Sequence, residues 1–382
     1  MFPELETPPV VARHSAGLLP SQRIRELIDS GYITASIPIE PAQIQPASLD
    51  LRLGPVAYRV RASFLPGAGT RSTVLGKVEE LKTHEIDLSQ PAVLEKGCVY
   101  VAPLMEEWHL PPGIYGKANP KSTTGRLDVF TRLITDYGTE FEGVPAGYKG
   151  KLYLEIVPRT FSILVRSGTR LNQIRFLRGD AQPGDSALVQ LHEHQPILFY
   201  GDGIIRDPKI DDGIWISVDV SGMGDSEIIG YRAKAYAPLV DLDRVNYYDL
   251  AEFWEPIHRT GKRSLILNPG DFYILASKER VRVPPEFAAE MVAYDPSVGE
   301  FRIHYAGFFD PGFGYGAGGI EGTHAVLEVR SHEVPFVLED WQRVGRLIFE
   351  RLLDVPDKLY GPAIGSTYQG QDLALSKQFK RS

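Results

Sequence analysis

Residues in this chain recur at a fixed distance of 173 positions. Gly97 recurs as Gly270 and Tyr100 as Tyr273. The same offset relates Pro111-Pro112 to Pro284-Pro285, Leu154-Glu155 to Leu327-Glu328 and Phe176 to Phe349. An offset that is kept without a net gap over so long a stretch predicts two copies of one domain. We place the first copy in residues 1–200 and the second in residues 201–382.

Each copy is predicted to be mainly β-sheet. Residues 99–105, 151–158, 272–278 and 324–331 are short apolar runs rich in β-branched or aromatic residues, and the 37 Gly and 29 Pro supply frequent turns. We expect an antiparallel sandwich or distorted barrel in each copy, with few short helices. One helix is predicted within residues 20–33, with Ser21 as N-cap and Gly31 at its end. Residues 247–257 offer a weaker helical counterpart in the second copy.

Charge and composition argue against several classes of protein. A net charge of −8 disfavours nucleic acid as a partner, although a small anion held by a few cations stays open. No apolar run reaches the length of a membrane span and the N-terminus does not resemble an export signal, so we expect no membrane partner and a cytoplasmic location. The single cysteine, Cys98, excludes an internal disulfide and a multi-cysteine zinc site. We predict that His192-Glu193-His194 lies in a solvated loop rather than binding zinc.

Two segments carry polar groups in patterns that suit nucleotide chemistry. Lys121-Ser122-Thr123-Thr124-Gly125-Arg126 places hydroxyls and cations beside a glycine, which can present N–H groups and positive charge to a phosphate. Residues 306–313 contain the turn signature Asp310-Pro311-Gly312 and phenylalanines that could stack on a flat base. Taken alone, each segment is more simply interpreted as an ordinary polar loop or hairpin.

Together with other motifs, these segments resemble the dCTP deaminase family, a branch of the trimeric dUTPase superfamily. Residues 121–126 match its Arg-Ser-Ser-x-x-Arg motif, with Lys121 in place of the first Arg, and residues 305–313 match its Thr-Ala-Gly-x-Ile-Asp-Pro-Gly-Phe hairpin. Its Leu-Glu strand occurs twice, as Leu154-Glu155 and Leu327-Glu328. Residues 46–54 and 368–371 match its early strand and its C-terminal Tyr-Gln-Gly-Gln. The double length resembles a bacterial subgroup with a duplicated deaminase domain.

The resemblance implies two tandem dUTPase-like β domains, assembly into a homo-oligomer and metal-independent hydrolysis of dCTP to dUTP and ammonia. It implies that Glu328 moves protons at C4 of the base, that Ser122 and Arg126 contact the water, the base or the carboxylate, and that Ala306 acts through its carbonyl. Mg²⁺ would be carried by the triphosphate, no zinc would be needed, and dTTP would be an inhibitor. The substrate-binding residues implied in the same way are Lys121, Thr123, Thr124, Gly125, Gly307, Asp310, Val326, Leu327, Tyr360, Tyr368 and Gln371.

The two copies depart from the family in complementary ways. In the second copy, Asp295 and Gly299 replace the counterparts of Ser122 and Arg126, and in the first copy, Asp136 and Pro145 replace those of Ala306 and Asp310. We therefore expect one composite site, with the hydroxyl and cation from the first copy and the hairpin and Glu328 from the second. Glu155 would then be a relic or a structural residue, and the alternative keeps Glu155 catalytic.

Two other functions stay open at this point. A dUTP pyrophosphatase, or a bifunctional enzyme that releases dUMP, would use Asp310 to hold a water against the α-phosphate. The loss of motifs in both copies would also suit an inactive nucleotide-binding regulator.

Overall fold

A computed structural model of the chain describes residues 14–69, 73–292, 301–303, 307–315, 322–331, 333–361 and 373–381. Of residues 301–303 it describes the backbone. Five residues named above lie outside the described residues, namely Asp295, Gly299, Ala306, Tyr368 and Gln371.

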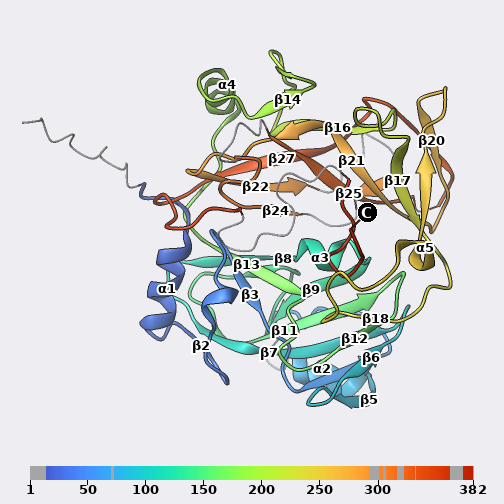
Figure 1. Ribbon diagram of the computed structural model, residues 1–382. Helices are drawn as coiled ribbons and strands as arrows, with labels where there is room; N and C mark the ends of the chain where they lie inside the picture. The colour runs from blue at the N-terminus through green and yellow to red at the C-terminus, as the bar shows by residue number, and fades with distance from the viewer. Residues whose placement is uncertain are drawn as a thin grey trace, which may run out of the picture.

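Two β-rich lobes lie one above the other in Figure 1, and the lower lobe is formed mainly by the first half of the chain, residues 14–180. Its elements are β1 (Gly17–Leu18), α1 (Ser21–Asp29), β2 (Ile33–Ala35), the 3₁₀ turn η1 (Pro41–Gln43), β3 (Leu49–Leu51), β4 (Val56–Val60), α2 (Val74–Leu81), β5 (Lys82–Asp87), β6 (Ala92–Leu94), β7 (Val99–His109), β8 (Tyr115–Pro120), α3 (Ser122–Gly125), β9 (Val129–Thr135), β10 (Gly143–Val144), β11 (Lys149–Pro158), β12 (Ile163–Val165) and β13 (Asn172–Arg178). One sheet has the order β1-β13-β8-β10, with β3 also on β13, and a second has the order β5-β4-β7-β11-β9, with β2 also on β7. Strands β6 and β12 pair in a third sheet.

The second half, residues 181–381, forms most of the upper lobe. Its elements are α4 (Asp185–His194), β14 (Leu198–Tyr200), β15 (Gly203–Ile204), β16 (Ile214–Asp219), β17 (Ile228–Ala233), β18 (Val240–Asp241), α5 (Leu250–Phe253), β19 (Trp254–His258), β20 (Ser264–Leu267), β21 (Phe272–Val281), β22 (Phe287–Val292), β23 (Phe301–Ile303), β24 (Phe308–Phe309), β25 (Thr323–Ser331), β26 (Phe336–Glu339) and β27 (Arg343–Arg351). Its main sheet has the order β15-β14-β21-β16-β27-β22-β24, and β25 also pairs with β21. The predicted mainly β fold with few short helices is confirmed.

The sequence repeat reappears as the same hydrogen bonds in both halves. The hydroxyl of Tyr100 accepts a bond of 2.9 Å from the N–H of Glu95, and the hydroxyl of Tyr273 accepts one of 2.9 Å from that of Asn268. Gly97 and Gly270 turn the chain into these strands with φ angles of 79° and 76°. Positive φ values of this kind cost glycine little, which explains why the repeat keeps glycine at both positions.

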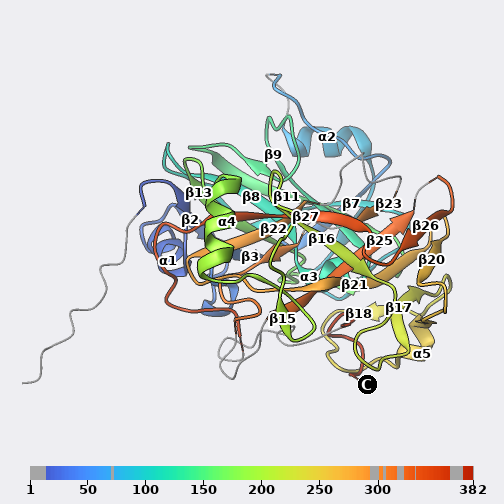
Figure 2. The ribbon, with the colours of Figure 1, turned by 90° about the horizontal axis from the view of Figure 1, so that it is seen from above.

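The helices differ from the prediction in three respects. The helix expected within residues 20–33 is present as α1, but Pro20 is its N-cap and Ser21 its first helical residue. Residues 247–257 form only the single turn α5 before β19 begins. His192-Glu193-His194 lies in α4 rather than in a loop, and His192 is buried, with its Nε2 2.6 Å from the carbonyl oxygen of Ile205. Figure 1 places α4 at the end of the second half that faces away from the first, and in Figure 2, which is seen from above, α4 accordingly lies in front.

The two halves share strands and apolar packing. Strand β14 pairs with β21 and therefore belongs with the second half, although it lies before residue 201, where the second copy was predicted to begin. That boundary stays a prediction. Conversely, β18 of the second half pairs in parallel with β12 of the first. Phe253, Trp254 and Phe379 are buried in the same apolar cluster as the first half's core. None of the helices in the described ranges has the length and apolarity needed to cross a membrane.

Arg175 joins the sheets of the two halves where they face each other. Its side chain is fully buried, and its Nη1 lies 3.0 Å from a carboxylate oxygen of Glu350 and donates to the carbonyl of Ala289 at 3.0 Å. Its Nη2 donates to the carbonyl of Phe309 at 2.9 Å and lies 3.7 Å from Asp310. A buried guanidinium with this many partners fixes how β13 lies against β22, β24 and β27.

Replacing Arg175 with Met is expected to destabilise the protein by about 3–5 kcal/mol, because Glu350 would stay buried without its cation. The matched control is Arg232→Met, which removes an exposed pair with Glu255 and is expected to cost less than about 1 kcal/mol. Urea unfolding of both variants measures the difference. Equal losses would show that Arg175 does not join the halves as described.

Candidate functional site

The helical turn α3 lies at the boundary between the two lobes (Figure 1). It begins directly after β8 and contains Ser122, and the N–H of Arg126 closes the turn on the carbonyl of Ser122 at 3.0 Å. The Nε atom of Arg126 lies 4.0 Å from a carboxylate oxygen of Glu328 in the second half. Of the two glutamates in Leu-Glu pairs, Glu328 is therefore the one that faces the first copy's motif.

The strand β25 explains why Glu328 points toward the first half. Successive side chains of a strand point to opposite faces. Leu327 and Val329 pack into the core of the second half, whereas Val326 packs against the core that includes the first half's strands. Glu328 shares the face of Val326, so the alternation of the strand directs its carboxylate across the boundary between the halves.

Burial sets the protonation behaviour of Glu328. Glu328 is only 7% exposed. This burial raises the pKa of its carboxyl to about 7, although the Arg126 guanidinium opposes the rise. A carboxyl with a pKa near neutral pH can both accept and release a proton, which suits a group that moves protons in catalysis.

The predicted hairpin forms as a tight turn beside a buried carboxylate. The N–H of Phe313 donates to the carbonyl of Asp310 at 3.0 Å, and Gly312 has a φ of 92°. Tyr360 packs on this turn, with its N–H 2.8 Å from the carbonyl of Pro311 and its ring 5.7 Å from that of Phe313. Burial raises the pKa of Asp310, while Arg175 acts to lower it.

The end of the chain covers α3. The carbonyl of Ala374 accepts a bond of 2.9 Å from Nη1 of Arg126, and the hydroxyl of Ser376 donates to the carbonyl of Thr123 at 2.9 Å. Figure 1 accordingly shows the C-terminus at the boundary between the lobes. Because residues 374–378 follow the Tyr-Gln-Gly-Gln segment, sequence comparison with the family motif did not single them out.

A pocket of about 260 Å³ opens beside α3. Its lining includes three cations, Lys121, Arg170 and Lys377, and the hydroxyl-bearing Thr123 and Thr124. Burial, followed by the field of Lys121, lowers the pKa of Lys377. The pocket also contains two carboxylates, and Asp50 pairs with Lys121 at 2.5 Å. Whole small-molecule sites usually measure about 300–1,000 Å³, so this pocket has room for part of a nucleotide.

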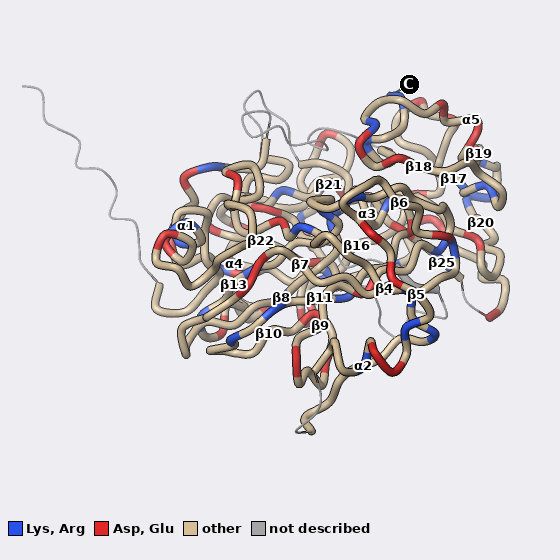
Figure 3. The backbone as a smooth tube through the Cα atoms, turned by 90° about the horizontal axis from the view of Figure 1, so that it is seen from below, with Lys and Arg blue, Asp and Glu red and all other residues tan. Residues whose placement is uncertain are grey.

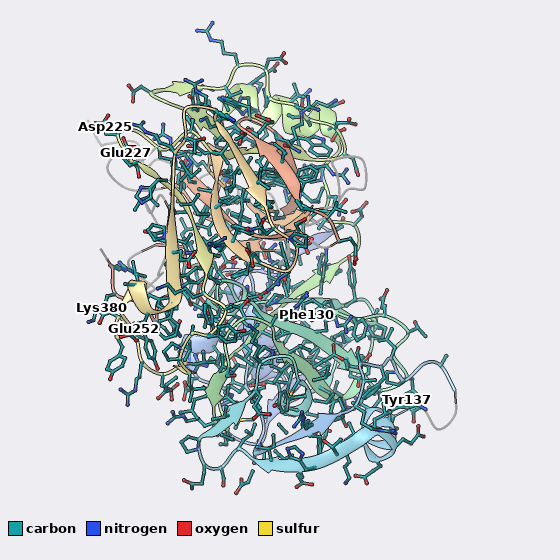
Figure 4. All side chains as sticks on the ribbon, turned by 90° about the vertical axis from the view of Figure 1, so that its right-hand side faces the viewer. Phe130, Tyr137, Asp225, Glu227, Glu252 and Lys380 are labelled. Atoms are coloured by element: carbon teal, nitrogen blue, oxygen red, sulfur yellow. The ribbon has the colours of Figure 1, made fainter. Side chains whose placement is uncertain are left out.

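Glu155, the equivalent glutamate of the first half, has a different environment. It is fully buried and lies opposite Arg132 in the β9–β11 register, with Arg132 Nε 2.9 Å from its carboxylate. The Arg132 guanidinium stacks 3.8 Å from the ring centre of Phe141 and also donates to Ser63 at 2.7 Å. Figure 4 shows the direction of β9, the strand that carries Arg132: Phe130 lies near the boundary of the lobes, whereas Tyr137, just beyond the end of the strand, lies at the outer edge of the first half.

The structure thus brings some of the predicted residues together. Two of the predicted first-half residues contact the second half: Arg126 lies beside Glu328, and the carbonyl of Thr123 accepts a bond from Ser376 in the C-terminal segment. Lys121, Thr123 and Thr124 line the pocket, while Asp310, Gly307 and Tyr360 belong to the hairpin region. Sequence reasoning missed Arg170, Lys377 and Asp50 as pocket residues. Two signals were available, because Asp50 lies within the early strand motif and Arg170 recurs as Arg343 at the offset of 173.

No group of three or more His, Cys, Asp or Glu side chains suited to a metal ion occurs among the residues that the structure describes. Lys and Arg are interspersed with Asp and Glu along the described chain (Figure 3). Binding of an anion would therefore depend on the local cations of the pocket.

Comparison with known proteins relates both halves to one family. Residues 15–180 match the family model "2'-deoxycytidine 5'-triphosphate deaminase (DCD) N-terminal domain", and residues 184–379 match the C-terminal domain of the same family. A crystal structure of 2'-deoxycytidine 5'-triphosphate deaminase from Agrobacterium tumefaciens is 52% identical, with a TM-score of 0.84 over 89% of this chain and 100% of that chain.

Two curated relatives match over shorter segments. A "dCTP deaminase, dUMP-forming" of Halobacterium salinarum is 36% identical over 28% of this chain and 52% of its own length. A "dCTP deaminase" of Natronomonas pharaonis is 32% identical over 28% of this chain and 52% of its own length. The chain therefore spans about half the length of these two curated relatives. Because the family models match almost the whole of the described chain, the protein belongs to the dCTP deaminase family.

Proposed function

We propose that this protein hydrolyses dCTP to dUTP and ammonia, with Glu328 as the group that moves protons. The observation that carries this proposal is the approach of Arg126 to Glu328 at 4.0 Å across the two halves, in a chain of the dCTP deaminase family. Burial beside one cation gives Glu328 a pKa of about 7, the range in which a carboxyl can act as base and then as acid.

The reaction balances with one water and one carboxylate. Glu328 takes a proton from water as the oxygen bonds to C4, and the proton passes to N3 of the base. The new hydroxyl then gives up its proton, which Glu328 delivers to the amine as the C4–N bond breaks and ammonia leaves. We propose that Arg126, 4.0 Å from Glu328, orients the carboxylate. Ser122, at the start of α3, is proposed to hydrogen-bond the water or the tetrahedral centre. Ala306 remains proposed to act through its carbonyl.

The cationic pocket is proposed to hold the phosphate end of the nucleotide. Lys121, Arg170 and Lys377 converge there beside the hydroxyl-bearing Thr123, and such groups bind phosphate oxygens. We propose that Mg²⁺ arrives with the triphosphate as part of the substrate. Gly125, Val326, Leu327, Tyr368 and Gln371 remain proposed substrate contacts.

Lys377→Ala is expected to raise the KM for dCTP by about 10- to 150-fold while changing kcat little, because one charge-assisted phosphate contact is worth about 1.5–3 kcal/mol and lies away from C4. Arg259→Ala, which removes an exposed pair with Glu227, serves as the control and should leave KM unchanged. Steady-state ammonia release measures both. A fall in kcat with constant KM would place Lys377 elsewhere than at the phosphates.

A second candidate is release of dUMP and pyrophosphate, and the position of Asp310 favours it. This carboxylate is buried 3.7 Å from Arg175 at the turn, where it could hold a water for attack on phosphorus. Incubation with dCTP separates the cases: ammonia alone indicates the deaminase, ammonia with pyrophosphate the bifunctional enzyme, and tight binding without turnover an inactive regulator. Inhibition by dTTP, a homo-oligomeric state and a cytoplasmic location stay predictions.

A further inference from the structure

A second pair of opposite charges crosses between the halves two residues beyond Arg126 and Glu328. Asp128 follows Arg126 in the first half, and Arg330 follows Glu328 on the same face of β25. Asp128 and Arg330 form a salt bridge and are both buried. Along the chain, the first half therefore presents a cation, Arg126, and then an anion. Strand β25 presents an anion, Glu328, and then a cation, so each charge faces one of opposite sign.

The salt bridge is embedded in further hydrogen bonds. Thr160 donates to the carboxylate of Asp128 at 2.5 Å and accepts from Arg330 at 3.0 Å. Arg330 also donates to the carbonyl of Gly270, and its guanidinium lies 5.8 Å from the ring centre of Phe272. Both charged groups are thus held from several sides, which makes their relative position well defined.

The backbone at residue 128 adopts a conformation that favours glycine. Asp128 has a φ of 55°, a left-handed conformation in which a non-glycine residue costs about 1–2 kcal/mol. Its N–H closes α3 by donating to the carbonyl of Gly125 at 2.8 Å. A glycine would form this turn without strain, so the carboxylate, through its bonds to Arg330 and Thr160, is what an aspartate adds here.

We propose that Asp128 and Arg330 are a positioning pair that holds α3 of the first half against β25 of the second, so that Arg126 meets Glu328 in the geometry needed for proton transfer. This inference rests on the proposed deamination by Glu328. It adds two residues that do not touch the reacting atoms but fix the cation and the carboxylate that do.

The charges around Glu328 make the pair detectable in a pH profile. Within the described residues, the charged groups whose fields act on Glu328 are Arg126 and Asp128, both from the first half. On the adjacent strand β21, the residue opposite Glu328 is Ile274, which carries no charge. The negative charge of Asp128 helps to raise the pKa of Glu328. Its removal should therefore let Glu328 ionise at lower pH.

The test measures kcat, KM, the pH dependence of ammonia release and the melting temperature for Asp128→Gly, Asp128→Asn, Arg330→Lys and Arg330→Met. Asp128→Gly relieves the strained φ while it removes the carboxylate, so it separates backbone effects from charge effects. The control is Lys278→Met, which breaks a buried pair with Asp219 and Asp340 inside the second half. Wild type and Glu328→Gln are assayed in parallel.

We expect both Asp128 variants to lose about 10- to 100-fold in kcat, since small misplacements of catalytic groups have effects of this size. The acidic limb of their pH profile, where activity falls as Glu328 takes up a proton, should move to lower pH. Arg330→Lys should retain more activity than Arg330→Met. Lys278→Met should lower the melting temperature but keep the wild-type kcat and acidic limb.

Folded Asp128 variants with wild-type kcat and an unmoved limb would overturn the inference, even if they melt earlier. Should neither variant fold, wild-type kcat in both Arg330 variants would overturn it as well. If wild type itself releases no ammonia from dCTP, the proposed function fails instead.

Discussion

Glu328→Gln is expected to lower kcat for dCTP deamination by about 100- to 10,000-fold, the usual contribution of a general acid–base group. Glutamine keeps the size of the side chain and can still lie near Arg126, but it can neither take a proton from water nor pass one to the amine. KM for dCTP should change little, because the phosphates are proposed to bind at Lys121 and Lys377.

Glu155→Gln is the matched control, because the repeat places it at the equivalent position in the first half. It should keep kcat within about threefold of wild type and lose about 1.5–3 kcal/mol of stability, since its charge-assisted bond to Arg132 is weakened. The reverse pattern, with activity lost in Glu155→Gln and kept in Glu328→Gln, would refute the composite site.

The second large effect concerns pH. Glu328 must be ionised to accept a proton from water, and its pKa is raised to about 7, so kcat/KM should fall about tenfold per pH unit below that value. Activity at pH 5 is therefore expected to be about 100-fold below the plateau. The measurement is ammonia release from dCTP between pH 5 and 9. An acidic limb near pH 4.5, the ordinary value of a glutamate, would show that Glu328 does not govern the rate.

The same shift predicts how Glu328 affects folding stability. Between pH 4.5 and about 7 the folded protein keeps the proton of Glu328 while the unfolded chain releases it. The folded state then binds more protons, so the contribution of Glu328 to stability falls as pH rises through this window and is fully lost above it. Glu328→Gln should remove this part of the pH dependence in urea unfolding at pH 4.5 and 7.5. An unchanged difference between the two pH values would contradict the assignment.

The repeat was the strongest guide available from the sequence, because it has a direct structural meaning. Residues that recur at a fixed offset adopt the same turns and make the same hydrogen bonds, as Tyr100 and Tyr273 do. The complementary motif losses led to a site shared by both halves, and Arg126 does lie beside Glu328. The roles of these residues stay predictions until the variants are measured.

Other features depend on contacts that no local pattern contains. Arg132 meets Glu155 because of the register between β9 and β11, and a register cannot be derived from one strand alone. Arg330 meets Asp128 across 202 positions of chain. The turn at α5 was expected to extend further, but the chain enters β19 at Trp254, which is buried in the first half's core, so tertiary packing overrides helical propensity.

A crystal structure of the Glu328→Gln variant with bound dCTP tests the central claim most directly, because it shows where the base lies when turnover is blocked. The account predicts C4 of the cytosine within about 4 Å of the residue 328 side chain, close to Arg126, with the phosphates near Lys121 and Lys377. A cytosine bound beside Glu155 and Arg132, with the region around residue 328 lacking nucleotide, would contradict it.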